Sequence, residues 1–187
     1  KESLKASGKE LRIGAIDLNS GEEVVVDQNH PDVGLFSMAS AAFPVAMEGV
    51  EYEGMTLVDW GLREVIPLRE AIRCGCTSVE VVLSGPYRGT AKKPAYTKWS
   101  VGKVGLRSAE IRTDEIWRGD LKCTHLRNKI AKEVQHSDYK EIEVNVWAPS
   151  EPLTSGVLTF KREELDEMIE LGRKAEPVTL AQFIEAQ

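Results

Sequence analysis

The stretch Met55-Thr56-Leu57-Val58-Asp59-Trp60-Gly61-Leu62 is the most informative part of this 187-residue chain. A short apolar strand, Thr56-Leu57-Val58, ends at Asp59, and a bulky aromatic residue and a glycine follow. Val58 and Trp60 are expected to exclude water partly from the Asp59 carboxylate, and such desolvation raises the pKa of a carboxyl group. A carboxylate of this kind can take a proton from a hydroxyl group. Asp59 could instead simply cap a turn, because aspartate favours turn positions.

The segments on either side predict alternating strands and helices. Strands are expected at 11–18, 23–27, 56–58, 78–84 and 142–146, and helices at 34–42, 67–73, 104–134, 161–174 and from 178 to about 186. The first two strands, joined by Asn19-Ser20-Gly21, predict a hairpin, and a turn is expected at Gly54. The run Val81-Val82-Leu83 predicts a buried strand that is parallel to its neighbours. This order of elements predicts the α/β class.

Composition and charge narrow the class of protein. The chain is 42% hydrophobic and 29% charged, which is typical of a globular domain and excludes collagen, a coiled coil and a disordered tail. Its net charge of −6 and the absence of a long basic stripe argue against duplex nucleic acid as a partner. No apolar run is long enough to span a bilayer. An odd number of cysteines, Cys74, Cys76 and Cys123, argues against a disulfide framework and favours a reducing, cytoplasmic location, and we expect Cys74 and Cys76 to be buried thiols.

Several familiar catalytic motifs are missing from the sequence. It contains no G-x-S-x-G, no G-x-G-x-x-G, no P-loop and no H-E-x-x-H. The histidines at 30, 125 and 136 are far apart and lack metal-ligand spacing, so neither a metal nor a cofactor is expected. Ser37, Ser40 and Ser84 are possible nucleophiles by residue type, but none stands in the glycine-flanked elbow that exposes a nucleophilic serine.

The Asp59 stretch, with the segments around it, resembles the second half of a patatin-like phospholipase domain. In that family an Ala-Ser-rich segment leads into a Phe-Pro bend, and a strand then delivers the catalytic aspartate in a D-G-G or D-G-A turn, followed by Leu, Pro and a helix. The corresponding residues are Ala39-Ser40-Ala41-Ala42-Phe43-Pro44, then Asp59-Trp60-Gly61-Leu62, then Pro67, Ala71 and Gly75. Residues 13–27, 115–120 and 161–174 also resemble parts of the family domain, so the likeness extends over nearly the whole chain.

Three departures from the family pattern stand out. Trp60 occupies a position where the family usually has glycine, a residue that tolerates positive φ and close backbone approach. Val65 stands where an asparagine is frequent. The family's Gly-rich oxyanion loop and its G-x-S-x-G elbow lie upstream, in sequence that this chain does not contain. The chain begins at Lys1 with neither methionine nor a signal peptide, and we expect a nucleophile-bearing segment before it.

The resemblance implies a fold and an activity. The fold would be a three-layer α/β/α patatin-like sheet, of which residues 1–187 supply the C-terminal portion as a single domain or part-domain. The activity would be a phospholipase A or esterase reaction on fatty-acyl esters, with a serine–aspartate dyad, an acyl-enzyme and no cofactor. Asp59 would be the catalytic aspartate, the serine would come from the upstream segment, and this chain alone would be inactive. Phe43, Pro44, Trp60 and Leu62 would be candidates for the wall of the acyl pocket, or else core residues.

The expected partners are the acyl-ester or lipid substrate and the upstream segment. Peripheral membrane contact is possible through a loop at 85–97 and the residues after it, which hold Tyr87, Lys92, Lys93, Tyr96, Lys98 and Trp99. The net charge of the chain, however, gives no attraction to anionic lipid. Two alternatives remain open: a non-catalytic binding or structural module that retains the patatin-like fold, and a self-sufficient small α/β domain of unrelated function.

Overall fold

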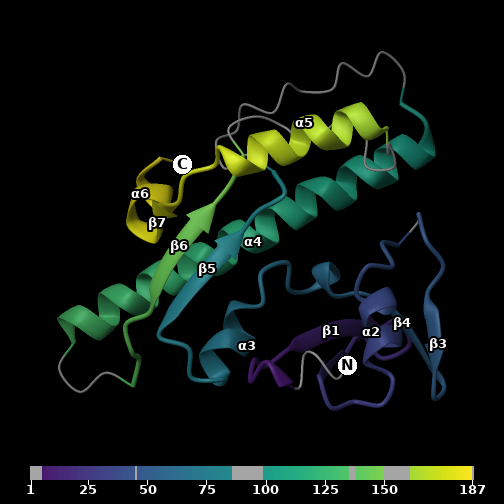
Figure 1. Ribbon diagram of the computed structural model, residues 1–187, viewed down its shortest axis with the longest axis horizontal. Coiled ribbons are helices and arrows are strands. Elements are labelled where there is room, and N and C mark those ends of the chain that lie inside the picture. Colours follow the sequence, from purple (N-terminus) through teal and green to yellow (C-terminus); the bar gives the residue numbers. More distant parts are fainter. Residues whose placement is uncertain (1–5, 45, 86–98, 135–137, 150–160, 187) are drawn as a thin grey trace. The chain divides into compact units, whose positions relative to one another are not determined.

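A computed structural model describes residues 6–44, 46–85, 99–134, 138–149 and 161–186 (Figure 1). The chain divides into two compact units. Unit 1 comprises Lys1–Val65 and Ser100–Trp117, and unit 2 comprises Ile66–Trp99 and Arg118–Gln187. Both units contain strands and helices, so the predicted α/β class is confirmed. The assignment of residues 1–187 to one larger patatin-like domain stays a prediction.

Unit 1 is built on an antiparallel sheet of four strands. In spatial order these are β2 (Glu23–Asp27), β1 (Arg12–Asp17), β4 (Met55–Asp59) and β3 (Val50–Tyr52). The predicted hairpin is β1 paired with β2, and its register sets Ile13 opposite Val26. A second hairpin joins β3 to β4 through Glu53 and Gly54, whose φ angles of 47° and 81° are both left-handed, as a tight two-residue turn requires. The turn at Gly54 is confirmed, whereas β3 was not predicted because it is only three residues long.

The two faces of this sheet carry separate apolar clusters, because successive side chains of a strand point to opposite faces. One face packs against α2 (Val33–Ala39). In this cluster the sheet contributes Ala15, Val26 and Leu57, and α2 contributes Phe36 and Ala39. The other face is formed by Ile16, Val58 and Trp60, with Val25 and Leu62 packed against them. Leu57 and Val58 therefore stabilise opposite sides of the same strand.

Unit 2 contains a smaller sheet of three strands. β5 (Ser78–Val82) is parallel to β6 (Glu143–Trp147), and β7 (Val178–Thr179) is antiparallel to β6. The predicted parallel pairing is therefore confirmed. The expectation that the whole apolar run at 81–83 is buried is wrong at Val82, whose side chain is 80% exposed while Val81 and Leu83 are buried. Strand alternation is the reason, since Val82 points to the face opposite its two neighbours.

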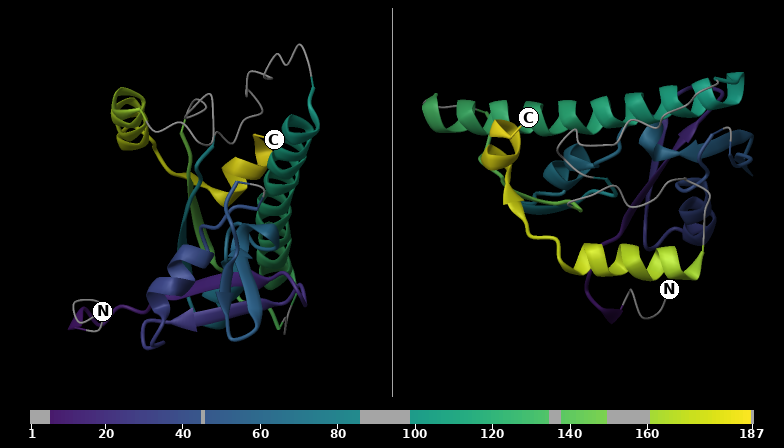
Figure 2. Two further views of the ribbon diagram at one scale, coloured as in Figure 1. Left: turned by 90° about the vertical axis from the view of Figure 1, so that its right-hand side faces the viewer. Right: turned by 90° about the horizontal axis from the view of Figure 1, so that it is seen from above.

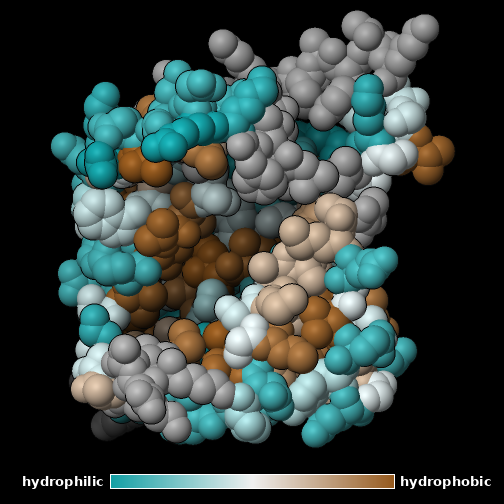
Figure 3. Space-filling model, turned by 45° about the vertical axis from the view of Figure 1, so that its right-hand side comes forward, coloured by the Kyte–Doolittle hydropathy of each residue, from teal (hydrophilic) through white to brown (hydrophobic). Residues whose placement is uncertain are grey.

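Among its described residues, unit 2 contains four helices or parts of helices. They are α3 (Leu68–Arg73), the C-terminal half of α4 (Val101–Glu133), α5 (Arg162–Arg173) and α6 (Leu180–Glu185). All four agree with the sequence prediction to within a few residues, and Figure 2 shows α4 as one unbroken helix. The core of the unit includes Leu121 of α4, Val146 of β6 and Phe183 of α6, which are completely buried. Large apolar side chains also remain at the surface, and Figure 3 shows such hydrophobic residues in brown on the face in view.

The cysteines lie differently from the prediction, because Cys74 and Cys76 are exposed. They flank Gly75, whose φ of +85° ends α3 in the left-handed conformation that glycine favours. The Gly75 and Cys76 N–H groups donate to the carbonyl groups of Ile72 and Ala71, the pattern of a helix end that turns out to the surface.

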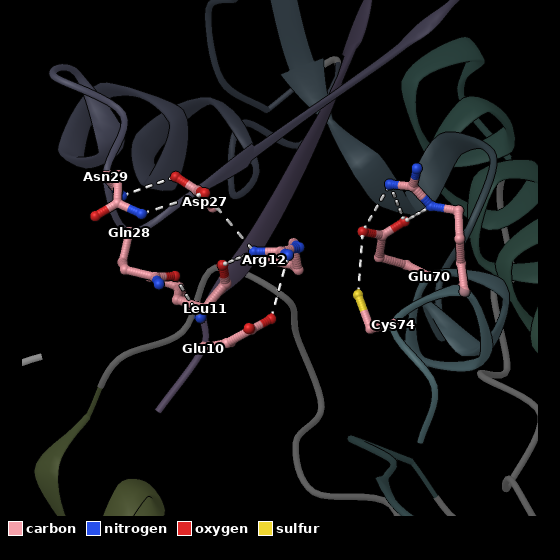
Figure 4. Close-up of polar contacts among 9 residues, drawn as sticks. Glu10, Leu11, Arg12, Asp27, Gln28, Asn29, Glu70 and Cys74 are labelled. Carbon is pink, nitrogen blue, oxygen red and sulfur yellow. Dashed lines mark hydrogen bonds and ion pairs between the residues drawn. The ribbon is translucent and has the colours of Figure 1, made fainter. Parts of the chain in front are cut away.

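Two groups of polar contacts stabilise the backbone around these elements (Figure 4). In unit 2, Glu70 is buried and accepts two hydrogen bonds from the Arg73 guanidinium, at 2.8 and 2.9 Å. In unit 1, the side chain of Arg12 lies between Glu10 and Asp27, at 3.2 and 4.0 Å. Such partly exposed ion pairs contribute little free energy each, so the apolar clusters remain the main source of stability.

Candidate functional site

The structure brings together the two stretches that carry the family resemblance. Asp59 is the last residue of β4 and lies opposite Ala15 of β1 in the sheet register. Its backbone N–H donates to the Ala42 carbonyl at 3.1 Å. Ala42 belongs to the small-residue segment that follows α2, so this hydrogen bond ties the end of the Asp59 strand to the Ala-Ser-rich segment. In strand alternation Asp59 follows Leu57, on the face that packs against α2.

The Asp59 carboxylate is half-buried and held at one oxygen. Oδ1 accepts a hydrogen bond of 2.7 Å from the Gly61 N–H, which begins the short 3₁₀ helix η1 (Trp60–Leu62). Among the described residues no other hydrogen-bond donor contacts this carboxylate, and no serine does. Burial raises the pKa of Asp59 above its ordinary value, while the Gly61 hydrogen bond opposes the shift. The predicted rise in the pKa of Asp59 is therefore confirmed in direction, and so is its role as a cap. Val58 and Trp60, the expected source of the desolvation, pack on the opposite face of the sheet.

Gly61 has a steric reason to be glycine. A Cβ atom at this position would lie 2.9 Å from Asp59 Oδ1, closer than ordinary contact allows. The carboxylate therefore occupies the space that a larger residue at position 61 would need. The spacing of an aspartate followed two residues later by glycine is thus explained by the contact between this side chain and the backbone.

Trp60, the main departure from the family pattern, is accommodated without strain in the backbone. Among the described non-glycine residues only Glu53 has a positive φ, so Trp60 does not need the conformational freedom of glycine. Its ring lies against Gly14, where an added Cβ would come within 2.1 Å of a ring carbon. Its Nε1–H donates to Glu23 at 3.3 Å. Trp60 is only 7% exposed and is a core residue of the cluster that includes Val58.

The other predicted wall residues occupy two different places. Leu62 packs against the Trp60 cluster, on the face of the sheet opposite the Asp59 row. Phe43 and Pro44 are half-buried in the connection between α2 and β3, directly after Ala42. The hydrogen bond from the Asp59 N–H to the Ala42 carbonyl ties the backbone of Asp59 to the residue before this connection, so Phe43 and Pro44 remain the better-placed candidates for an acyl pocket.

The remaining candidates give no second catalytic group. Ser37 and Ser84 are exposed and Ser40 caps the end of α2. The His30 ring packs edge-on against Phe36, and His125 lines a cavity of about 500 Å³ in unit 2. The described residues contain no cluster of three side chains that could hold a metal ion. His136 and the loop residues Tyr87, Lys92, Lys93, Tyr96 and Lys98 lie outside the described residues, whereas Trp99 is exposed.

Sequence reasoning missed a second carboxylate in the same sheet, that of Asp17 at the end of β1. This side chain is buried and accepts hydrogen bonds from the Ser20 hydroxyl at 2.7 Å and from the backbone N–H groups of Asn19, Ser20 and Thr56. These bonds, that of the Ser20 hydroxyl first, lower the pKa of Asp17. The turn residues Asn19-Ser20-Gly21 could have predicted these hydrogen bonds, because an aspartate before a turn often accepts from the backbone two or three residues later. Asp17 is thus strongly hydrogen-bonded, whereas Asp59 keeps one oxygen without a donor among the described residues.

Comparison with known proteins adds no assignment: no protein-family model and no curated protein matches this sequence. None of the helices in the described part of the chain is long and apolar enough to cross a membrane.

Proposed function

We propose that this chain is the C-terminal portion of a patatin-like lipid acyl hydrolase, a phospholipase A or esterase with a three-layer α/β/α sheet. Asp59 pairs with a serine from an upstream segment of the same protein. The observation that carries the proposal is the state of Asp59, because its carboxylate is half-buried, has a raised pKa and retains an oxygen without a donor among the described residues. Perturbed carboxyl groups of this kind are found preferentially at functional sites.

The chemistry follows from the two oxygens of the carboxylate. The Gly61 N–H holds Oδ1, which orients Oδ2 to accept the proton of the serine hydroxyl. The serine oxygen then attacks the ester carbonyl carbon, and the alcohol leaves with that proton. A water molecule attacks the resulting acyl-enzyme with Asp59 as the base, which releases the fatty acid and regenerates the serine. The oxyanion would be stabilised by N–H groups of the upstream Gly-rich loop.

No histidine or cofactor enters this scheme. The raised pKa of Asp59 makes its carboxylate a stronger base than an ordinary exposed aspartate. The enzyme acts in the cytoplasm and meets its substrate as a peripheral protein at a lipid surface. Phe43 and Pro44 form part of the acyl pocket in this proposal, since their connection is the one bonded to the Asp59 strand.

The decisive experiment compares Asp59→Asn with the wild-type protein that includes the upstream segment, using a chromogenic acyl ester. Asparagine retains an oxygen that can accept the Gly61 hydrogen bond, so the fold is kept while the base is lost. We expect kcat to fall by about 10²–10⁴, the usual contribution of a general base. Asp166→Asn, at an exposed position of α5, is the matched control and should leave kcat unchanged. If Asp59→Asn hydrolysed the ester at the wild-type rate, the assignment of Asp59 as the catalytic base would be wrong.

The alternative of a non-catalytic module rested mainly on Trp60 in the aspartate turn. The contact of Trp60 with Gly14 now accounts for that residue without loss of the Asp59 geometry. A fluorophosphonate probe separates the two alternatives, because it reacts covalently only with an activated serine. Labelling of one upstream serine is expected for the enzyme, and a protein that is neither labelled nor active would be the binding module.

A further inference from the structure

The C-terminal half of α4 has an apolar stripe on the side opposite the core. Leu121 and Thr124 are buried, and Asn128 donates to and accepts from the backbone of Ile142 at 2.7 and 3.0 Å, so these residues define the face that packs against unit 2. With 3.6 residues per turn, a different set of positions lies on the opposite face. This set, which we call the outer stripe, consists of Cys123, Leu126, Ile130 and Val134.

The outer stripe is open to solvent along its whole length. Leu126, Ile130 and Val134 are 58%, 40% and 52% exposed, and Cys123 is also exposed. β5 and β6 lie on one side of α4 (Figures 1 and 2), and the packing residues of that side are not part of the stripe. Keeping a contiguous row of apolar side chains in water costs free energy, and such a row is typical of an interaction surface.

Cationic side chains border the stripe. Lys122 and Lys129 are exposed along one border and Arg127 lies along the other, where its guanidinium lies 5.7 Å from the centre of the exposed Tyr139 ring. Residues 122–134 contain four lysines or arginines and one acidic residue, although the chain as a whole has a net charge of −6. The acidic residue, Glu133, is exposed one helical turn after Lys129 on the same border, so that border keeps one net positive charge from Lys122, Lys129 and Glu133. Lys132 is engaged on another side, in an ion pair of 2.8 Å with Glu141.

This combination distinguishes between the kinds of partner that could cover the stripe. An apolar centre with cationic borders and an aromatic residue beside it matches the interface of a lipid bilayer, where acyl chains meet charged headgroups. Each lysine or arginine near an anionic surface adds attraction, and exposed cations gain most there. By contrast, two copies of the stripe packed in parallel would set Lys122, Arg127 and Lys129 against the same residues of the other copy, and such like-charge pairing opposes self-association.

We propose that the outer stripe of α4 binds an anionic lipid surface, with Leu126, Ile130 and Val134 at the level of the acyl chains and Lys122, Arg127 and Lys129 at the phosphates. This inference goes beyond the proposed hydrolase activity and does not depend on Asp59. It assigns attraction to anionic lipid to one face of one helix, although the net charge of the chain would predict repulsion.

The test is binding of the full-length protein to vesicles of phosphatidylcholine alone and of phosphatidylcholine mixed with phosphatidylserine. Binding is expected to the mixed vesicles and to weaken with added salt, because salt screens the headgroup charge. Neutralising both lysines in Lys122→Gln/Lys129→Gln should weaken partitioning roughly 25-fold, about fivefold for each charge. The control Lys174→Gln/Ile169→Ser removes one charge and one apolar side chain at exposed positions at the end of α5 and within it, and should have no effect.

A second measurement locates the contact directly. A polarity-sensitive dye on Cys123, in a protein with Cys74→Ser and Cys76→Ser, should shift to shorter wavelength when mixed vesicles are added. Leu126→Ser/Ile130→Ser should abolish the shift while the circular dichroism spectrum stays unchanged. Equal binding to both vesicle types, or wild-type binding by Lys122→Gln/Lys129→Gln, would overturn the proposal. The proposal would also be overturned if Leu126→Ser/Ile130→Ser changed the oligomeric state of the protein but not its binding to vesicles, because the stripe would then join two copies of the chain.

Failure of this proposal and failure of the hydrolase proposal give different results. Asp59→Asn should retain wild-type vesicle binding whether or not the protein is an enzyme. The variants of the outer stripe should retain hydrolysis of a dissolved chromogenic ester, since none of their residues lies in unit 1, where Asp59 is found.

Discussion

The contact between Gly14 and Trp60 predicts a large and specific effect of a single added methyl group. In Gly14→Ala the new Cβ would lie 2.1–2.4 Å from three carbons of the Trp60 ring. Carbon atoms normally approach to about 3.5–4.0 Å, so the ring would have to move by about 1.5 Å. Such overpacking costs about 1–3 kcal/mol, and the gain from replacing glycine in a strand returns only about 0.5–1 kcal/mol. We therefore expect Gly14→Ala to lower the free energy of unfolding by about 1–2 kcal/mol.

The same reasoning predicts that the penalty depends on the ring. Trp60→Leu alone should cost about 2–4 kcal/mol, because it empties space in the core and removes the hydrogen bond to Glu23. In a Trp60→Leu background the added methyl group meets no ring, so Gly14→Ala should become neutral or slightly stabilising. The coupling energy of the double-mutant cycle is then about 1–3 kcal/mol.

Urea unfolding followed by far-ultraviolet circular dichroism measures all four proteins of the cycle without relying on tryptophan fluorescence. The matched control is Gly34→Ala in α2, where an added Cβ meets nothing within 4 Å and should stabilise the protein. The reasoning is refuted if Gly14→Ala is as harmless as Gly34→Ala, or if it costs the same with and without the Trp60 ring.

Three further predictions concern the two carboxylates and the turn. The pKa of Asp59 is raised on folding, so the protonated side chain favours the folded state and this contribution is lost as pH rises from 3.8 through the raised value. Asp59→Asn cannot lose a proton and should therefore be more stable than wild type at neutral pH. The difference between their urea midpoints should vanish in acid. The pKa of Asp17 is instead lowered on folding, so Asp17→Asn should be less stable than wild type at neutral pH. This difference should shrink as pH falls below the ordinary aspartate range. Equal urea midpoints at neutral pH would contradict the role of the hydrogen bonds to Asp17. Gly61→Ala should displace the Asp59 carboxylate and lower kcat of the proposed hydrolase activity by about 10²-fold, whereas Gly75→Asn, at the end of α3, should leave kcat unchanged.

Much of the local structure follows from short-range signals in the sequence. The first hairpin, the helix ended by Gly75 and the long helix α4 were predicted because hydrophobic periodicity and turn residues act over a few positions. The direction of the Asp59 pKa shift was predicted, but Val58 and Trp60, the expected cause, pack on the face of the sheet opposite Asp59. The short strands β3 and β7 were missed because two or three residues carry no readable period.

Only the tertiary structure decided which distant residues meet. No local pattern shows that Trp60 lies on Gly14, that the Asp59 N–H bonds to Ala42, or that Asp17 accepts from Thr56. Burial likewise depends on which face of an element other segments cover, and Val82 and the two cysteines beside Gly75 lie on sides that no other described segment buries.

The sequence by itself therefore determined most of the elements, the α/β class and the aspartate that our proposal makes catalytic, because backbone preferences and hydrophobic periodicity are local properties. The tertiary structure decided the state of that aspartate's two oxygens, the place of Trp60 and the separation of α4 into a packed face and an outer stripe. These depend on contacts between residues far apart in the chain, whose pairing is determined by packing as a whole.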